Sequence, residues 1–269
     1  MILDLSRPTV MGILNVTPDS FSDGGRFFFR DAALKQAETM VAEGASIIDV
    51  GGESTRPRAP TVSEQEELDR IMPVLEGILA HLPVAVSVDT SKPGVIREAL
   101  RLGVSMINDV RALREPGALD AVAGSDAWIC LMHMQGNPAT MQNAPVYDDM
   151  VADIKGFLRQ RMDACLQAGI SRERLMVDPG FGFGKTQAHN LTLLRRLGEF
   201  HDLDLPLMVG LSRKSTIGNL LNAPPEERLH GSVAAAVIAA WQGAWILRVH
   251  DVRPTAEALT ICTAVQNAD

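Results

Sequence analysis

The 269-residue sequence predicts an α/β fold of the (β/α)₈ barrel type, a TIM barrel in a single domain. Short continuous apolar runs alternate with segments of helical pattern, and this alternation occurs eight times. Polar or glycine-rich residues follow each apolar run, and no linker, low-complexity tract or shift in composition divides the chain. A doubly wound open sheet is the alternative that the same alternation leaves open.

The expected strands are continuous apolar runs, because strands of a parallel sheet are buried on both faces. They lie at residues 10–15, 46–51, 84–89, 105–108, 128–133, 175–178, 207–212 and 245–250. The expected helices lie at residues 31–43, 63–80, 93–102, 116–123, 148–168, 189–197, 226–242 and 254–266.

Start and stop signals support several of these helices. Asp31 is placed to cap the first helix, and Ser63, followed three residues later by Glu66, predicts a capping box. Gly103 and Gly169 are placed as C-terminal caps, since glycine adopts the left-handed conformation that ends many helices.

The charge balance argues against two classes of partner. Lys and Arg number 25 against 33 Asp and Glu, which gives a net charge of -8 and a pI near 5.3. We therefore expect neither nonspecific nucleic-acid binding nor attachment to an anionic membrane. The apolar stretch at 233–247 is interrupted by Gln242 and Gly243, so we expect a buried helix followed by a strand there rather than a membrane span.

The cysteines and the first residues indicate the compartment. Cys130, Cys165 and Cys262 are scattered through apolar or helical contexts, so neither a disulfide framework nor a zinc site is expected. The first residues have no basic start and no small-residue cleavage site, so we expect no signal peptide and a cytoplasmic location.

Polar residues stand at the carboxyl end of nearly every expected strand, which is where barrels of this type place their active sites. In chain order they are Asn15, Asp49, Asp89, Asn108, His133, Asp178, Ser212, Arg213, Lys214, Arg248 and His250. Because buried polar and charged groups need partners, we expect a ligand on which many of these side chains converge. For Asp49 and His133 we expect structural hydrogen bonding.

One set of these residues suits a nitrogen heterocycle. Asp89, Asn108, Asp178 and Lys214 can between them accept hydrogen bonds from amino and ring N–H groups and donate to a ring carbonyl.

A second set suits an anion. Arg56, Arg248 and His250 stand out in an acidic chain and predict a site for phosphate or diphosphate. Asn15 would supply an oxygen ligand to a Mg²⁺ bound to that anion, since Mg²⁺ keeps most of its waters and needs few protein ligands.

Residues 11–25 predict a shaped loop that leaves the first strand and covers a ligand. The apolar run stops at Asn15, and Thr17-Pro18 opens a polar segment with a fixed proline φ. Gly24-Gly25 ends it with permissive backbone.

Residues 178–186 match the end of a phosphate-binding loop at Gly184-Lys185-Thr186. The first glycine of that motif would fall on Pro179, so we expect these glycines to shape the turn after Asp178 instead. No His-Glu-x-x-His pair, cysteine cluster or Gly-x-Ser-x-Gly elbow occurs in the sequence. This excludes a metalloprotease of that motif, a cysteine-bound zinc site and an α/β-hydrolase.

Seven motifs, in order, resemble those of the dihydropteroate synthases, and the resemblance extends over essentially the whole chain. They are residues 11–23 (MGILNVTPDSFSD), 48–57 (IDVGGESTRP), 87–91 (SVDTS), 107–109 (IND), 178–182 (DPGFG), 212–215 (SRKS) and 248–250 (RVH). The resemblance implies one pterin-binding (β/α)₈ barrel domain over residues 1–269. It implies an enzyme of folate biosynthesis, a transferase that condenses 6-hydroxymethyl-7,8-dihydropterin diphosphate with 4-aminobenzoate to give 7,8-dihydropteroate and pyrophosphate. The implied mechanism is a dissociative substitution at the pterin methylene carbon.

The resemblance also implies roles for individual residues. Carried over motif by motif, it assigns the pterin to Asp89, Asn108, Asp178 and Lys214, the diphosphate to Asn15, Arg56, Arg248 and His250, Mg²⁺ to Asn15, and 4-aminobenzoate to Phe21, Thr55, Pro57 and Ser212. Asp89, Asp178, Lys214 and Arg56 are the implied catalytic residues.

The same resemblance implies a homodimer and inhibition by sulfonamides that mimic 4-aminobenzoate. The alternative is a noncatalytic pterin-binding barrel, like those that supply methyl groups to corrinoid proteins. Such a barrel needs no diphosphate loop, so the presence of Arg56, Arg248 and His250 in the motifs argues against it.

Overall fold

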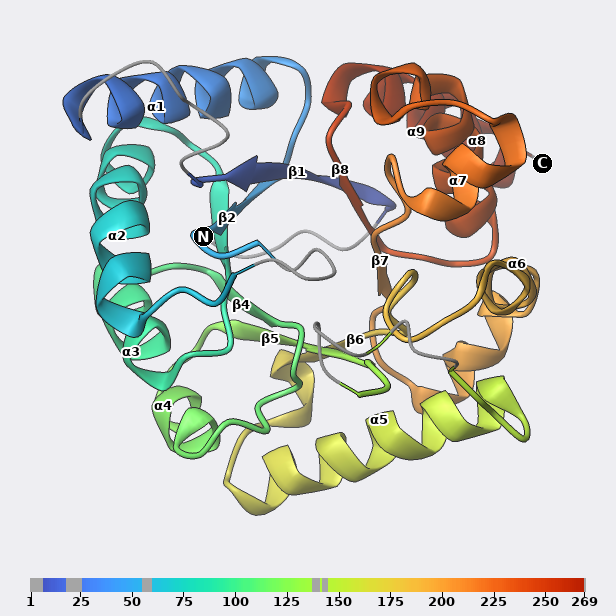
Figure 1. The fold of residues 1–269 in the computed structure, drawn as a ribbon, viewed down its shortest axis with the longest axis horizontal. Helices are drawn as coiled ribbons and strands as arrows, with labels where there is room; N and C mark the ends of the chain where they lie inside the picture. Colours follow the sequence, from blue (N-terminus) through green and yellow to red (C-terminus); the bar gives the residue numbers. More distant parts are fainter. Residues whose placement is uncertain (1–6, 18–25, 55–59, 137–140, 142–144, 269) are drawn as a thin grey trace.

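Eight parallel strands form one sheet that curls into a nearly closed barrel, and the helices surround it (Figure 1). This is seen in a computed structural model, which describes residues 7–17, 26–54, 60–136, 141 and 145–268, without the side chains of 26–29. Neighbouring strands follow the order β6-β5-β4-β3-β2-β1-β8-β7, and a parallel bridge between Val177 and Leu207 joins the two ends of the sheet. The (β/α)₈ barrel prediction is therefore confirmed, and the open sheet is excluded.

The strands and helices alternate along the chain as the sequence predicts. The strands are β1 (Thr9–Asn15), β2 (Ile47–Gly51), β3 (Ala85–Asp89), β4 (Met106–Asp109), β5 (Trp128–Met132), β6 (Leu175–Asp178), β7 (Met208–Val209) and β8 (Ile246–Val249). The helices are α1 (Arg26–Ala42), α2 (Glu64–His81), α3 (Pro93–Leu102), α4 (Ala118–Ala123), α5 (Met150–Gln167), α6 (Gln187–Arg195), α7 (Ser215–Leu221), α8 (Leu229–Trp241) and α9 (Val252–Gln266), with 3-10 turns η2 (Arg172–Arg174), η3 (Leu197–Leu203) and η4 (Pro225–Glu227).

The predicted helix ends are partly confirmed. The Ser63 hydroxyl accepts a hydrogen bond from the Glu66 N–H at 3.2 Å, while the Glu66 carboxylate pairs with Arg70. Gly103 and Gly169 have φ of 89° and 80°, as expected of C-terminal caps.

One prediction about the helices is wrong, and one helix was not predicted. Asp31 does not cap α1, which begins at Arg26, because nothing between Gly25 and Asp31 breaks a helix. Helix α7, a two-turn helix that follows the very short β7, is not predicted from the sequence. Its seven residues are too few to show a clear helical period.

The expected interruption of the apolar stretch at 233–247 is present. Helix α8 ends at Trp241, and β8 begins at Ile246. In the part of the chain that the structure describes, no helix has the length and apolar character needed to cross a bilayer.

The interior of the barrel is filled by one apolar side chain from each strand. These side chains are Met11, Ile47, Ala85, Met106, Cys130, Met176, Met208 and Ile246, and all are essentially inaccessible to solvent. We call this layer the plug. Because side chains alternate across a strand, the next residues to face the interior lie two positions further along each strand, toward its carboxyl end.

Candidate active site

The layer above the plug changes from apolar to polar. The residues two positions beyond the plug are Ile13, Asp49, Ser87, Asn108, Met132, Asp178, Gly210 and Arg248. Three of them, Asp49, Asp178 and Arg248, are charged and come from β2, β6 and β8. The alternation of side chains along each strand therefore brings residues that are far apart in sequence to one level of the barrel mouth. Asn15 on β1 and Asp89 on β3 each lie two residues beyond this layer, toward the carboxyl end of the strand. Both pair with Gly51 on β2, so they lie at the same level of the barrel.

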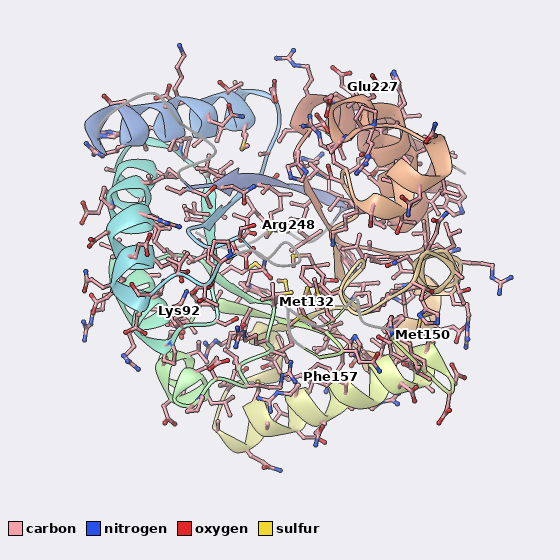
Figure 2. The ribbon with its side chains drawn as sticks, viewed as in Figure 1. Lys92, Met132, Met150, Phe157, Glu227 and Arg248 are labelled. Atoms are coloured by element: carbon pink, nitrogen blue, oxygen red, sulfur yellow. The ribbon has the colours of Figure 1, made fainter. Side chains whose placement is uncertain are left out.

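Arg248 lies near the centre of this layer (Figure 2). Its Nε donates to Oδ2 of Asp49 at 2.6 Å, and its Nη2 donates to Oδ2 of Asp89 at 2.8 Å. Asn108 also donates to Oδ2 of Asp49, at 3.1 Å. One guanidinium from β8 thus holds carboxylates on β2 and β3, and Asp49 takes the structural hydrogen bonds expected of it.

Each of these two carboxylates keeps one oxygen without a donor. Oδ1 of Asp49 and Oδ1 of Asp89 are buried and have no hydrogen-bond partner among the described residues, and the same holds for the hydroxyl of Ser87. A buried acceptor left unpaired costs about 1–3 kcal/mol, so native proteins pair nearly all of them. The layer therefore lacks donors that a ligand with N–H groups would supply.

The pKa of Asp89 lies far above its ordinary value. Burial raises the pKa to about 7, the charge of Arg248 lowers it, and the charge of Asp49 raises it. Arg248 itself has a raised pKa, since the two carboxylates outweigh its burial, and it stays charged.

Asp178 and Lys214 form a second charged group across the mouth. Asp178 ends β6 and accepts from the N–H of Gly180 at 2.7 Å, whereas Lys214 directly precedes α7. The Lys214 ammonium donates to the carbonyl of Phe181 and lies 4.7 Å from the centre of the Phe183 ring. Burial lowers the pKa of Lys214 to about 8 against the opposing charge of Asp178, and burial raises the pKa of Asp178.

The loop after Asp178 is shaped by its glycines, as predicted. Gly180, Gly182 and Gly184 have φ of 72°, 80° and 61°, a region that other residues adopt only with strain. A side chain on Gly180 would also place its Cβ 1.9 Å from the carbonyl oxygen of His133.

Lys185 holds this loop from inside. Its ammonium donates to the carbonyls of Gly180 and Phe183 at 2.9 and 3.1 Å, and lies 3.0 Å from Nδ1 of His133. Burial, and then the charge of Lys185, lowers the pKa of His133 to about 2, so the ring is neutral and its Nδ1 accepts. His133 therefore has the structural role expected of it. The role of Lys185 was not predicted: its signals in the sequence were its place after a glycine-rich turn and the partial match to a phosphate-binding loop.

Ser212 and His250 lie side by side. The Ser212 Oγ accepts from the backbone N–H of His250 at 3.1 Å and is also 3.1 Å from its Nδ1. Arg213 turns away from the mouth and pairs with Asp251. The remaining predicted site residues, Phe21, Thr55, Arg56 and Pro57, lie outside the described residues.

Comparisons with known proteins agree with this geometry. The sequence matches the pterin binding enzyme family over residues 11–250. It is 59% identical over 266 residues to the dihydropteroate synthase of Escherichia coli strain K12, with 99% of this chain and 94% of that protein covered. A crystal structure of the Yersinia pestis dihydropteroate synthase with a sulfonamide drug is 57% identical, with a TM-score of 0.95 and 99% and 97% of the chains covered. The Xanthomonas albilineans dihydropteroate synthase with 4-aminobenzoic acid is 51% identical, with a TM-score of 0.94 and 99% and 96% covered.

The chain therefore belongs to the family of pterin binding enzymes. Its place within that family is among the dihydropteroate synthases, transferases of folate biosynthesis. This decides against the noncatalytic pterin-binding barrel that the sequence analysis kept as an alternative.

Two glycine substitutions distinguish the cost of left-handed backbone strain from the cost of a collision between an added Cβ and the His133 carbonyl. Gly180→Ala should lower the free energy of unfolding by roughly 3 kcal/mol or more, because it adds left-handed strain and a collision with the His133 carbonyl. Gly103→Ala is the matched control: its φ is 89°, but nothing lies within 4 Å of the added Cβ, so about 1 kcal/mol is expected. Urea unfolding measures both, and equal losses would show that the approach to His133 does not matter.

Proposed function

We propose that the barrel mouth of this synthase binds the pterin through Asp89, Asn108, Asp178 and Lys214. The observation that carries this proposal is the pair of unpartnered buried oxygens, Oδ1 of Asp89 and Oδ1 of Asp49. A pterin presents amino and ring N–H groups on one edge and a ring carbonyl beside them, which complements carboxylate acceptors and an ammonium donor. Asp49 is a further acceptor at this site and joins the set derived from the sequence.

The diphosphate is proposed to lie above the pterin, on Asn15, Arg56, Arg248 and His250. Arg248 uses Nε and one Nη2 donor on its two carboxylates, and a guanidinium has five N–H donors, so it has donors left for an anion. His250 stands two residues further along from Arg248, beside the Ser212 hydroxyl.

Mg²⁺ is the proposed metal on the diphosphate, and the residues present fit it. Among the described residues, no group of three or more His, Cys, Asp or Glu side chains could hold a metal by itself. Asn15, at the end of β1, supplies an amide oxygen at the mouth. Mg²⁺ prefers oxygen and takes one or two protein ligands when substrate phosphates supply others. When bound, it would neutralise charge on the pyrophosphate leaving group.

The proposed reaction is a dissociative substitution. The bond from the pterin methylene carbon to the diphosphate oxygen breaks, and its electron pair leaves with pyrophosphate. Arg248, His250 and Arg56 stabilise that leaving group, while Asp89 and Asp178 stabilise the positive charge that spreads onto the pterin. The amine of 4-aminobenzoate then forms the carbon–nitrogen bond and loses a proton to solvent, so the protein needs no nucleophile of its own.

The 4-aminobenzoate is proposed to bind at Phe21, Thr55, Pro57 and Ser212. The similar Xanthomonas albilineans enzyme with 4-aminobenzoic acid and the Yersinia pestis enzyme with a sulfonamide drug support this substrate and this class of inhibitor. We also propose a cytoplasmic location, for which the three buried free cysteines are suited.

The activity is tested directly with isotope-labelled 4-aminobenzoate. Label should enter dihydropteroate only when pterin diphosphate and Mg²⁺ are both present, and a sulfonamide should compete with the label. Lys214→Ala should reduce turnover at least about 100-fold, because it removes a preorganised cation. Lys155→Ala is the control: it removes a lysine of α5 that pairs with Asp202 of η3, and it should keep normal turnover. Incorporation without pterin diphosphate would contradict the proposal.

The shifted pKa values of Asp89 and Lys214 predict how kcat/KM depends on pH. Asp89 acts as a carboxylate, so kcat/KM for the pterin diphosphate should fall as pH drops below about 7. Lys214 acts as an ammonium, so kcat/KM should also fall as pH rises above about 8. Lys214→Arg should move the alkaline limb upward, since guanidinium stays protonated. An unchanged alkaline limb in this variant would remove Lys214 from that role.

A homodimer is proposed through the outer face of α7, α8 and α9, which lie together in Figure 1. This face exposes large apolar side chains: Leu220, Leu221, Ile238, Trp241, Ile261 and Val265. Trp241, which is 57% exposed, is the largest of them. Light scattering should give twice the chain mass, and Trp241→Glu should shift the protein toward the monomer at equal concentration. A monomer in the unsubstituted protein would exclude this interface.

A further inference from the structure

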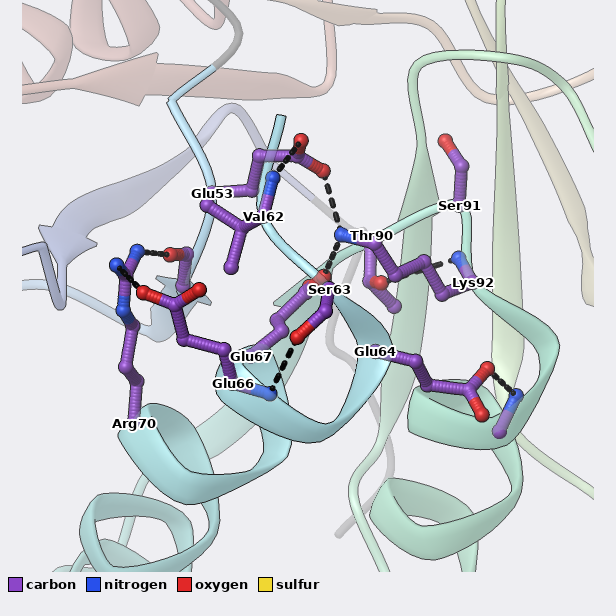
Figure 3. A network of polar contacts seen from close by, with 12 residues as sticks. Glu53, Val62, Ser63, Glu64, Glu66, Glu67, Arg70, Thr90, Ser91 and Lys92 are labelled. Atoms are coloured by element: carbon purple, nitrogen blue, oxygen red, sulfur yellow. Dashed lines mark hydrogen bonds and ion pairs between the residues drawn. The ribbon is translucent and has the colours of Figure 1, made fainter. Parts of the chain in front are cut away.

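A partly buried group of three charges joins the starts of α2 and α3 to the end of β2 (Figure 3). Lys92, at the start of α3, pairs with Oε2 of Glu53 at 2.6 Å and with Oε2 of Glu67 on α2. The Glu67 side chain is 1% exposed, and the Lys92 and Glu53 side chains are 21% and 27% exposed. We call these three residues the charge triad.

Glu53 connects two points of the chain that are nine residues apart. Its Oε2 binds Lys92, while its Oε1 accepts from the backbone N–H of Val62 at 3.0 Å. One carboxylate therefore holds residue 53, which follows β2, against residue 62, which precedes α2. The residues between them include Thr55, Arg56 and Pro57.

The first end of this segment is also attached to α2. Arg70 donates to the carbonyl of Gly52 at 2.7 Å. The backbone of Gly52 approaches α2 so closely that a Cβ there would lie 2.8 Å from Cγ2 of Ile71 and 2.9 Å from Cγ of Glu67. The start of the segment thus has a defined place against the same helix that carries Glu67.

The triad is attached to the pterin side of the mouth as well. Lys92 follows Asp89 by three residues, and its backbone N–H donates to the hydroxyl of Thr90 at 3.2 Å. Burial lowers the pKa of Lys92, but its hydrogen bonds to Glu53 and Glu67 outweigh this and raise it, so the ammonium is charged.

Stability alone is a weak reason for this arrangement. Oε1 of Glu67 is buried without a hydrogen-bond partner among the described residues, and burial raises the pKa of that carboxyl. Buried ion pairs are often no more stabilising than apolar side chains of equal volume. What the triad does supply is a fixed distance among the end of β2, the start of α2 and the turn after β3.

We propose that Lys92, Glu53 and Glu67 are positioning residues for the aminobenzoate side of the reaction. They hold residue 53, after β2, and residue 62, before α2, on the turn that follows Asp89. They thereby fix the two points from which the chain that carries Thr55 and Pro57 of the proposed aminobenzoate site extends. This inference rests on the proposed roles of Thr55, Arg56 and Pro57.

The test compares Lys92→Met, which keeps the length of the side chain without its charge, with the unsubstituted enzyme. KM for 4-aminobenzoate should rise at least about tenfold, since small misplacements of a positioning group cost up to about 100-fold. Affinity for 6-hydroxymethyl-7,8-dihydropterin without its diphosphate should change by less than about twofold, because the pterin residues do not belong to the triad. Hydrogen exchange at the Val62 amide should speed up at the same time. Glu53→Gln, a milder change that keeps an acceptor for Val62, should shift KM in the same direction by a smaller factor.

Two variants serve as controls. Glu64→Gln alters a carboxylate that also joins α2 to α3, through the N–H of Gly94 at 2.8 Å, but contacts neither end of the segment. Lys155→Met removes a lysine whose side chain is 14% exposed and which pairs with Asp202, so it joins α5 to η3 and not to the triad. Both should leave KM for 4-aminobenzoate within about twofold of the original value, because a hydrogen bond and an ion pair that only support structure do not hold the segment.

The outcomes separate the triad from the proposed function. Faster Val62 exchange with an unchanged KM for 4-aminobenzoate would show a purely structural triad and overturn the inference. An equal loss of affinity for both substrates would indicate general damage and overturn it too. If Thr55→Ala and Pro57→Ala leave KM for 4-aminobenzoate unchanged, the proposed role of the segment fails, whereas Val62 exchange still reports whether the triad holds its ends.

Discussion

The ion pairs of Arg248 with Asp49 and Asp89 are the interaction on which the mouth of the barrel depends. Three carboxylates, those of Asp49, Asp89 and Asp178, lie buried at this mouth, and without a cation their mutual repulsion and loss of hydration would drive protons onto them. Arg248 crosses from β8 to reach two of them, at 2.6 and 2.8 Å. It leaves one oxygen of each unpaired, so the same contacts that allow the carboxylates to be buried keep acceptors available for a substrate.

Two lysines, the buried Lys185 and the partly buried Lys92, hold irregular segments as Arg248 holds the strand ends. Lys185 ties together the glycine-rich turn after β6 by donating to two of its carbonyls and to His133. Lys92 ties the ends of the segment after β2 to the turn after β3 through Glu53 and Glu67. In both cases an amino group with several N–H donors replaces a run of local hydrogen bonds that an irregular segment cannot form. The irregular segments that hold these residues thereby have fixed attachments at the rim of the barrel.

Much of the site could be predicted because it follows the period of a strand. Asn108 and Asp178 stand two residues beyond plug positions, so an apolar run followed by a polar residue already indicates that each faces the mouth. The partners of these residues could not be predicted. The motif placed Arg248 with the anion, yet in the structure its guanidinium contacts two carboxylates that are 199 and 159 residues away in sequence. Lys185 was missed because its acceptors depend on how the loop folds back, which no local pattern records.

The sequence by itself determined the order of the strands and of the helices other than α7, the cap at Ser63, the glycine ends at Gly103 and Gly169, and which strand ends carry polar groups. These features depend on interactions between residues a few positions apart, so they leave a local signal. Only the tertiary structure decided that Arg248 joins Asp49 to Asp89, and that Glu53 joins Val62 to Lys92. Those contacts depend on the register of the strands and on the closure of the barrel. Register and closure result from the packing of all eight strands together, so no single segment of the sequence encodes them.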